Sequence, residues 1–269
     1  MHDGRLIGVL QLLNRRDGQF DAFDEKLIQA FASHAATAIE RWRLQEQARK
    51  SQEMKLAIEV GRSIQTGFLP QSLPSIPGYE LSAWWQPADE VSGDYYDVIP
   101  LSDGRIGLVI ADVSGHGIGP SLIMASVRAM LRVLCRTISD PTQIVRALSD
   151  SITPDLHEGR FITLLFAALD PTTHELEFSN AGHGPALHHR RTADDFATLD
   201  STTWPIGFDS DAPHALPGRT VLEPGDRLVL ATDGAIELRD AAGAMFGRPR
   251  LEDSVRQAGS AAKDVSGSI

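Results

Sequence analysis

Cysteine, long apolar runs and excess basic charge are all scarce in this sequence of 269 residues. The single cysteine, Cys135, cannot build a disulfide framework, which indicates a reducing compartment. Lysine and arginine number 25 against 36 aspartates and glutamates, so the net charge of -11 argues against nucleic acid or an anionic membrane as the main partner. No run is long enough to span a bilayer, and the N-terminus lacks the regions of a signal peptide. We therefore expect a cytoplasmic protein without membrane insertion.

Three aspartates stand beside glycine where apolar runs end. They lie in Val91-Ser-Gly-Asp94, Ala111-Asp112-Val-Ser-Gly-His-Gly117 and Leu230-Ala-Thr-Asp233-Gly234. A strand that ends at such a turn holds a carboxylate at the edge of a sheet. One Asp-Gly pair alone is most often a simple turn, but three of them favour an acidic pocket. Because packed carboxylates repel, such a pocket is typical of a cation site, and its hard oxygen ligands favour magnesium or manganese.

Three other site chemistries can be weighed against the cation site: a nucleotide loop, a histidine acid and a zinc site. Gly115-His-Gly-Ile-Gly119 lies between a predicted strand and a predicted helix, but a dinucleotide fingerprint would need a glycine where Pro120 stands. His116 is a candidate general acid, since histidine titrates near neutrality, or a loop residue that hydrogen-bonds locally. His183 and the pair His188-His189 have no cysteine partner and no His-x-x-x-His spacing, which disfavours zinc.

Residues 75–269 are predicted to form the main domain. The hairpin-type link Asp170-Pro-Thr-Thr-His174 joins two strands directly, which favours antiparallel sheets with segregated helices, an α+β layered domain. The helix expected first is apolar on most sides and is predicted to be buried. The apolar runs predict strands at residues 79–86, 105–112, 161–170, 175–181 and 227–232, and helices at residues 121–137 and 142–156.

The N-terminal part of the chain has a different pattern. In residues 1–42, Leu6-Ile-Gly-Val-Leu-Gln-Leu-Leu13 predicts a buried strand, and apolar residues every three to four positions predict a helix from Phe23. One strand and one helix cannot bury a core of their own, so we expect the remnant of a truncated domain. Residues 43–74 are predicted to be a helical signalling linker. The narrow apolar stripe of residues 43–68 suits either a parallel dimer or packing on its own domain.

Four motifs in fixed order carry a family resemblance: Val91-Ser-Gly-Asp94-Tyr-Tyr-Asp97, Ala111-Asp112-Val-Ser-Gly-His-Gly117, Asn180-Ala-Gly-His-Gly-Pro185 and Thr232-Asp-Gly-Ala-Ile-Glu237. Together they resemble the bacterial PPM-type serine/threonine phosphatases, in the branch named after stage II sporulation protein E and the Rsb regulators of stress sigma factors. The resemblance spans residues 52–258. It implies an αββα sandwich of two antiparallel sheets flanked by helices.

A second resemblance lies upstream. Gly8-Val-Leu-Gln-Leu-Leu-Asn14, a short turn, Phe23-Asp24 and a helix that ends in Ala38-Ile-Glu40 resemble the C-terminal end of a GAF sensor domain. This resemblance implies a partial GAF domain in residues 1–42, ahead of the linker. The part of a GAF fold that would hold most of a ligand pocket has no counterpart in this segment, so no ligand follows from it.

The phosphatase resemblance also implies a site of two manganese or magnesium ions at one edge of the sandwich. By motif match, Asp112 bridges both ions, Asp94 belongs to the shell of one, and Asp233 ligates the other. The backbone carbonyl of Val113 is a further ligand. His116 matches the Gly-His-Gly pattern of the branch, but its offset differs from that of the histidine acid of eukaryotic relatives, so a catalytic role does not carry over.

The implied activity is hydrolysis of phosphoserine or phosphothreonine on a signalling protein, by water that two metals activate. In this branch the substrate is typically an anti-anti-sigma protein of the STAS type, and the upstream sensor regulates the site. Two metals lower the pKa of a shared water and offset charge on the phosphoryl oxygens. No cysteine lies near any motif, which agrees with a mechanism without a covalent phosphoenzyme.

One departure from the family pattern leaves an alternative open. The family ends in a strand with an Asp-Asp-x-Thr motif that supplies another carboxylate, and Lys263-Asp-Val-Ser266 follows Phe246-Gly247 too soon to match it. The ligand is therefore not carried over to Asp264, and we expect a fragment of a longer protein. The alternative is a non-catalytic signalling or binding module with an incomplete metal site. The motifs assign no role to Asp97 or His183.

Overall fold

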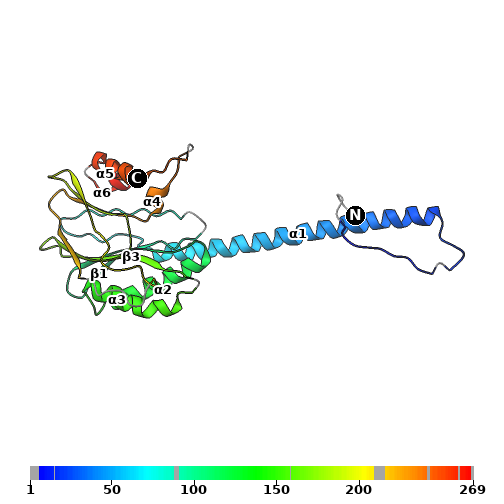
Figure 1. The fold of residues 1–269 in the computed structure, drawn as a ribbon, viewed down its shortest axis with the longest axis horizontal. Helices are drawn as coiled ribbons and strands as arrows, with labels where there is room; N and C mark the ends of the chain where they lie inside the picture. Colours follow the sequence, from blue (N-terminus) through cyan, green and yellow to red (C-terminus); the bar gives the residue numbers. More distant parts are fainter. Residues whose placement is uncertain are drawn as a thin grey trace. The chain divides into compact units, whose positions relative to one another are not determined.

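The computed structural model describes residues 6–14, 16–87, 91–157, 159–208, 216–240, 243–259 and 261–267. The chain divides into two compact units, Met1–Glu59 and Val60–Ile269. Helix α1 (Ala22–Phe68) begins in the first unit and ends in the second (Figure 1). In the described ranges, no helix combines the length and the apolar character needed to cross a membrane.

In the N-terminal unit, one predicted element is wrong and another is confirmed. Residues 6–14 form neither helix nor strand, so the predicted strand at residues 6–13 is wrong. A strand needs a neighbour for its backbone hydrogen bonds, and none of the strands in the described residues pairs with this segment. The helix predicted from Phe23 is confirmed. The carboxylate of Asp21 accepts hydrogen bonds from the backbone N–H groups of Phe23 and Asp24, which satisfies donors that the first turn leaves open.

Two antiparallel sheets carry the fold of the C-terminal unit (Figure 1). Their strands are β1 (Tyr95–Pro100), β2 (Ile106–Val113), β3 (Ile162–Leu169), β4 (Glu175–Ala181), β5 (Ala186–Arg190), β6 (Asp195–Thr198), β7 (Gly218–Val221) and β8 (Arg227–Leu230). Five strands form one sheet in the order β1-β2-β3-β4-β7, and three form the other in the order β6-β5-β8. The expected α+β fold with two antiparallel sheets is confirmed.

Helices cover the outer face of each sheet. Their bounds are α2 (Ile118–Leu134), α3 (Pro141–Ile152), the 3-10 turn η1 (Thr153–Asp155), α4 (Gly234–Glu237), α5 (Gly247–Gln257) and α6 (Ala262–Ser266). Helices α2 and α3 lie on one side of the sandwich and α5 on the other (Figure 1). The two predicted helices at residues 121–137 and 142–156 correspond to α2 and α3. Asp140 begins α3, since its side chain accepts a hydrogen bond from the N–H of Gln143 at 2.9 Å.

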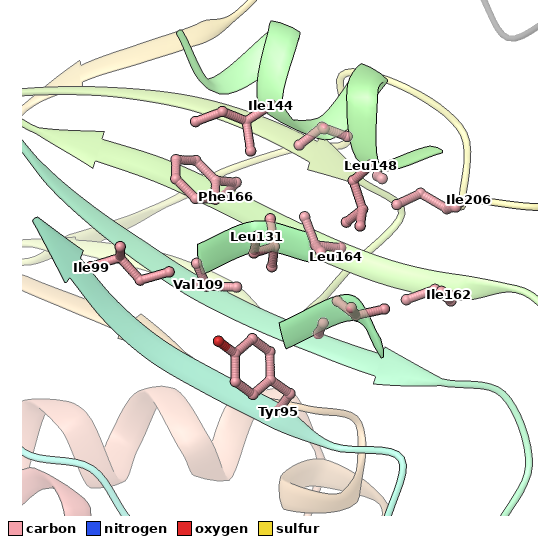
Figure 2. Close-up of a cluster of buried hydrophobic side chains, with 14 of the residues drawn as sticks. Tyr95, Ile99, Val109, Leu131, Ile144, Leu148, Ile162, Leu164, Phe166 and Ile206 are labelled. Atoms are coloured by element: carbon pink, nitrogen blue, oxygen red, sulfur yellow. The ribbon is translucent and has the colours of Figure 1, made fainter. Parts of the chain in front are cut away.

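Strand β3 explains why the layers stack as they do. Its side chains alternate between the faces of the sheet, and both faces are buried. Leu164 and Phe166 belong to the core under α2 and α3, together with Leu131 and Leu148 (Figure 2). Leu165 and its alternate neighbours belong to a second core between the sheets. A third apolar cluster, Leu187, Val229, Leu251 and Val255, packs α5 onto the smaller sheet.

Two further predictions about elements need correction. The predicted strand at residues 79–86 is absent from the described residues, where only Tyr79 forms an isolated bridge, with Ile76. Helix α2 is not buried on most sides. Its inner residue Leu131 is fully buried, whereas Leu122 is 64% exposed and Val133 65% exposed. A helix that covers a sheet from outside buries only one face, so the other face meets solvent.

Candidate metal centre

Asp112 is the next-to-last residue of β2, a strand held on both sides. It pairs with Thr163 of β3, while β1 flanks β2 on the other edge. Beyond it, the N–H of Ser114 donates to the carbonyl of Phe161 at 2.9 Å. This double ladder fixes the backbone at the end of the strand and so fixes the half-buried carboxylate of Asp112.

Gly93 brings the second predicted aspartate beside the first. The N–H of Val113 donates to the carbonyl of Gly93 at 3.4 Å. A Cβ at Gly93 would stand 2.6 Å from the carbonyl oxygen of Val113 and 3.1 Å from Oδ1 of Asp112. Only glycine allows so close an approach. The carbonyl of Val113 and the turn that carries Asp94 therefore lie against the carboxylate of Asp112.

The charges of the three aspartates reach one another. Burial raises the pKa of Asp112 to about 7, and the negative charges of Asp94 and Asp233 contribute to the rise. Burial also raises the pKa of Asp94, and the charge of Asp233 again adds to the effect, against a hydrogen bond from Ser92 that lowers it. The carboxylates predicted from the sequence thus share one electrostatic environment.

Asp233 comes from the second sheet. It is exposed, follows β8, and starts α4, where its carbonyl accepts from the N–H of Ile236 at 2.9 Å. His116 is exposed in the turn between β2 and α2. Among the described residues, no three His, Cys, Asp or Glu side chains are grouped so that they could hold a metal ion. The assignment of Asp94, Asp112 and Asp233 as ligands therefore stays a prediction.

The donor set nevertheless suits hard divalent cations. Carboxylates and a carbonyl are the oxygen ligands that magnesium and manganese prefer. Burial and repulsion from the charges of Asp94 and Asp233 raise the pKa of Asp112 to about 7, and a bound cation would offset that repulsion. The residues present thus fit the ions that the resemblance implies, with Asp112 central because both neighbouring carboxylates act on it.

His183 lies inside the loop between β4 and β5 and is 5% exposed. Its Nδ1 lies 2.9 Å from Oγ1 of Thr163, the residue opposite Asp112 in the β2–β3 ladder. Within the described residues its Nε2 has no hydrogen-bond partner. Burial lowers the pKa of His183 to about 4, so the ring is neutral at pH 7, although the charge of Asp233 opposes that shift. The Asn180 side chain holds the loop, accepting from the N–H of His183 at 2.7 Å.

Asp97 has a structural role that the motif alone did not reveal. Its side chain is fully buried and accepts hydrogen bonds from Nε and Nη2 of Arg132 at 2.7 and 2.9 Å. The hydroxyl of Tyr95 donates to the same carboxylate at 2.6 Å. This ion pair ties α2 to β1.

The paired histidines of β5 also have aspartate partners. Nε2 of His188 lies 2.8 Å from Asp226, and its Nδ1 lies 3.1 Å from Thr220. Nε2 of His189 lies 3.0 Å from Asp194. Both rings are buried in the smaller sheet, where these contacts link strands and turns.

Gln65, near the end of α1, reaches the same turn as Asp94. It is 3% exposed. Its Oε1 accepts from the N–H of Ser92 at 3.0 Å, and its Nε2 donates to the carbonyl of Ser92 at 2.5 Å. The hydroxyl of Ser92 then donates to Oδ2 of Asp94 at 3.0 Å. Sequence reasoning missed Gln65, because its partners are backbone groups and only its place beside an apolar helix stripe hinted at burial.

Comparison with known structures defines the fold. The structure aligns with the SiaA-PP2C domain of Pseudomonas aeruginosa at a TM-score of 0.67 and 21% identity, covering 81% of this chain and 87% of that domain. Residues 102–267 match the family model described as Stage II sporulation protein E (SpoIIE), and residues 1–39 match that of the GAF domain. The molecule thus has a PP2C-type fold. The chain belongs to the stage II sporulation protein E family, as the motifs predicted.

Two curated relatives support the same assignment. Protein IcfG of Synechocystis sp. is 30% identical over 235 residues, which cover 75% of this chain and 36% of IcfG. Phosphoserine phosphatase RsbU of Bacillus subtilis is 28% identical over 206 residues, which cover 77% of this chain and 61% of RsbU. The chain therefore spans between about one third and three fifths of the length of these relatives.

Proposed function

We propose that this chain is a metal-dependent protein serine/threonine phosphatase that hydrolyses phosphoserine or phosphothreonine. Asp112, Asp94, Asp233 and the carbonyl of Val113 would hold two manganese or magnesium ions. The observation that carries the proposal is the approach of the Gly93 turn to Asp112, which brings two half-buried carboxylates with raised pKa values, Asp94 and Asp112, to one sheet edge. Perturbed carboxylates in such a group are typical of functional sites.

Such ions, when bound, supply positive charge to the phosphoryl oxygens and lower the pKa of water. The chain's own residues hold the carboxylate ligands in place. Asp112 is fixed by the β2–β3 ladder, and Ser92 orients Asp94 by a hydrogen bond of 3.0 Å. Cys135 does not suit the role of a nucleophile, since it is buried at the C-terminal end of α2 and burial raises the pKa of its thiol to about 11.

We further infer the class of substrate and the route of control. RsbU is named a phosphoserine phosphatase, which supports a protein that carries phosphoserine as the substrate. The family resemblance implies that this protein is of the anti-anti-sigma type. Control by an upstream sensor is supported by the GAF match and by the contact of Gln65 with Ser92, through which the end of α1 reaches the turn that carries Asp94. Exposed apolar residues along α1, Met54, Leu56, Val60 and Ile64, support a homodimer through residues 43–68.

A non-catalytic signalling module is the second candidate. It is favoured by one observation, that no three potential ligands are grouped to hold a metal within the described part of the chain. A module of this kind would bind a partner without turnover.

The test is hydrolysis of para-nitrophenyl phosphate and of a phosphoserine peptide in manganese and in EDTA. We expect turnover in manganese, its loss in EDTA, and its loss in Asp112→Asn, which removes charge with little change in volume. Asp150→Asn is the matched control, since that carboxylate is 73% exposed on α3 and paired with Arg146. Equal turnover of Asp112→Asn and the wild type in saturating manganese would remove Asp112 from the proposed site, and a folded wild type without turnover would favour the signalling module.

A further inference from the structure

Four large apolar side chains are exposed close to the candidate metal centre. Ile118 and Leu122 lie on the first turns of α2 and are 52% and 64% exposed. Trp204 and Phe208 lie in the segment between β6 and β7 and are 46% and 65% exposed. We call these four residues the apolar rim. Single exposed apolar residues are ordinary on a protein surface, but several in one place mark an interaction site.

The aromatic half of the rim is held in a defined shape. The ring of Phe208 packs edge-on against Trp204, with centroids 5.7 Å apart, and against Phe161, with centroids 6.5 Å apart. Beneath them, Ile162 and Ile206 exchange both backbone hydrogen bonds at 2.9 Å. Both isoleucines are buried in the core under α2 (Figure 2). The rings therefore stand on a fixed backbone.

The rim is continuous with the loop that follows Asp112. Phe161, which contacts Phe208, accepts a hydrogen bond from the N–H of Ser114 and donates its own N–H to Oγ of Ser114, both at 2.9 Å. The neighbouring Arg160 reaches the first turn of α2, which carries Ile118. Its guanidinium lies against Gly119, where an added Cβ would stand 2.8 Å from Nη1. The segments that carry the rim thus meet at the strand end that carries Asp112.

We propose that the apolar rim is the docking surface for the phosphorylated protein substrate, a proposal that rests on the phosphatase function proposed above. A phosphoserine side chain is short, so the protein surface around it must lie on whatever borders the metal centre. The rim borders it through Ser114 and offers aromatic anchors of the kind that dominate protein interfaces. Arg160 adds a positive charge there, suited to a partner that carries phosphate.

The experiment compares binding with small-molecule hydrolysis. The probe is a STAS-domain protein phosphorylated on serine and labelled for fluorescence anisotropy, measured against the full chain in EDTA so that binding needs no turnover. The variants are Phe208→Ala and Leu122→Ala, singly and together. The matched control is Val133→Ala, which removes an equally exposed apolar side chain at the far end of the same helix. Circular dichroism establishes that each variant is folded.

We expect the double variant to raise the Kd for the phosphorylated protein by about tenfold or more, as loss of interface anchors does. Its kcat/KM for para-nitrophenyl phosphate should equal that of the wild type, and Val133→Ala should change neither value. An unchanged Kd in the folded double variant overturns the proposal. A shift from dimer to monomer in that variant with an unchanged Kd overturns it too, by assigning the rim to a second copy of the chain. Weaker binding in a chain whose wild type lacks turnover would support the docking surface and refute the proposed activity.

Discussion

Gln65 gives the sharpest test of how the end of α1 is connected to the metal centre. The change Gln65→Ala removes both hydrogen bonds to the backbone of Ser92, at 2.5 and 3.0 Å. A buried backbone group left without its partner costs about 1–3 kcal/mol. Two groups lose their partner, so the full cost would be about 2–6 kcal/mol. Because Ser92 is only half-buried, water can replace part of what is lost, and we expect a total at the lower end, about 2–3 kcal/mol.

A loss of that size should lower the Tm by about 4–12 °C for a unit of this length. The variant should also need more manganese for half-maximal turnover, since the Ser92 hydroxyl that orients Asp94 loses its fixed backbone. Gln65→Glu should retain the hydrogen bond from the N–H of Ser92 but lose the one to its carbonyl, and it adds a negative charge near Asp94. Gln52→Ala is the control, because that glutamine is exposed on the same helix.

The assays are thermal unfolding followed by circular dichroism and a manganese titration of para-nitrophenyl phosphate hydrolysis. A Tm equal to that of the wild type would show that Gln65 does not fasten the helix end. A lower Tm with an unchanged manganese requirement would show that the contact is structural and does not reach Asp94.

Three further predictions follow from single sites. Burial lowers the pKa of His183 from 6.5 to about 4, so between these values the unfolded chain binds a proton that the folded chain excludes. The contribution of His183 to stability is therefore complete above pH 6.5 and is lost as the pH falls toward 4. His183→Gln should flatten a plot of Tm against pH over that window. Gly93→Ala should abolish turnover, because its Cβ would stand 2.6 Å from a carbonyl oxygen of β2, whereas Gly67→Ala, with nothing within 4 Å, should leave turnover unchanged. Arg132→Ala should lower the free energy of unfolding by about 3 kcal/mol, because it leaves the carboxylate of Asp97 buried without its cation. Urea denaturation measures this change, and a value below about 1 kcal/mol would contradict the stabilising role of the Arg132–Asp97 ion pair.

The strongest sequence signals were those that depend only on local pattern. Strand β3 is a continuous apolar run buried on both faces, and β2 is an apolar run buried on one face and partly buried on the other. Both were predicted close to their observed bounds. No strand was predicted at the position of β1, where Asp97 interrupts the apolar residues. Its carboxylate is buried in the fold, where it pairs with Arg132 of α2. At residues 6–13 the opposite error occurred: a strand was predicted from the apolar run, but none of the strands in the described residues pairs with it, and a strand needs a neighbour for its backbone hydrogen bonds.

The residues of the candidate site also differ in whether local sequence predicts them. The position of the Asp112 carboxylate at a sheet edge could be predicted, because consecutive residues of the sequence form the strand end and the glycine turn that follows it. Gln65 could not, since its partner Ser92 is 27 residues away and contributes only backbone atoms. The burial of His183 was equally hidden, because it depends on Thr163 from a neighbouring strand. Contacts of this kind become visible only when the sheets are assembled.

The central claim is that Asp94, Asp112 and Asp233 hold the metal ions, and anomalous diffraction at the manganese edge tests it most directly. Crystals of the chain soaked in manganese chloride should show two anomalous peaks flanking Asp112, one beside Asp94 and the other beside Asp233. The same soak of Asp112→Asn should show neither peak at full occupancy. Manganese bound only at other residues, in protein that hydrolyses phosphoserine in the same buffer, would contradict the account.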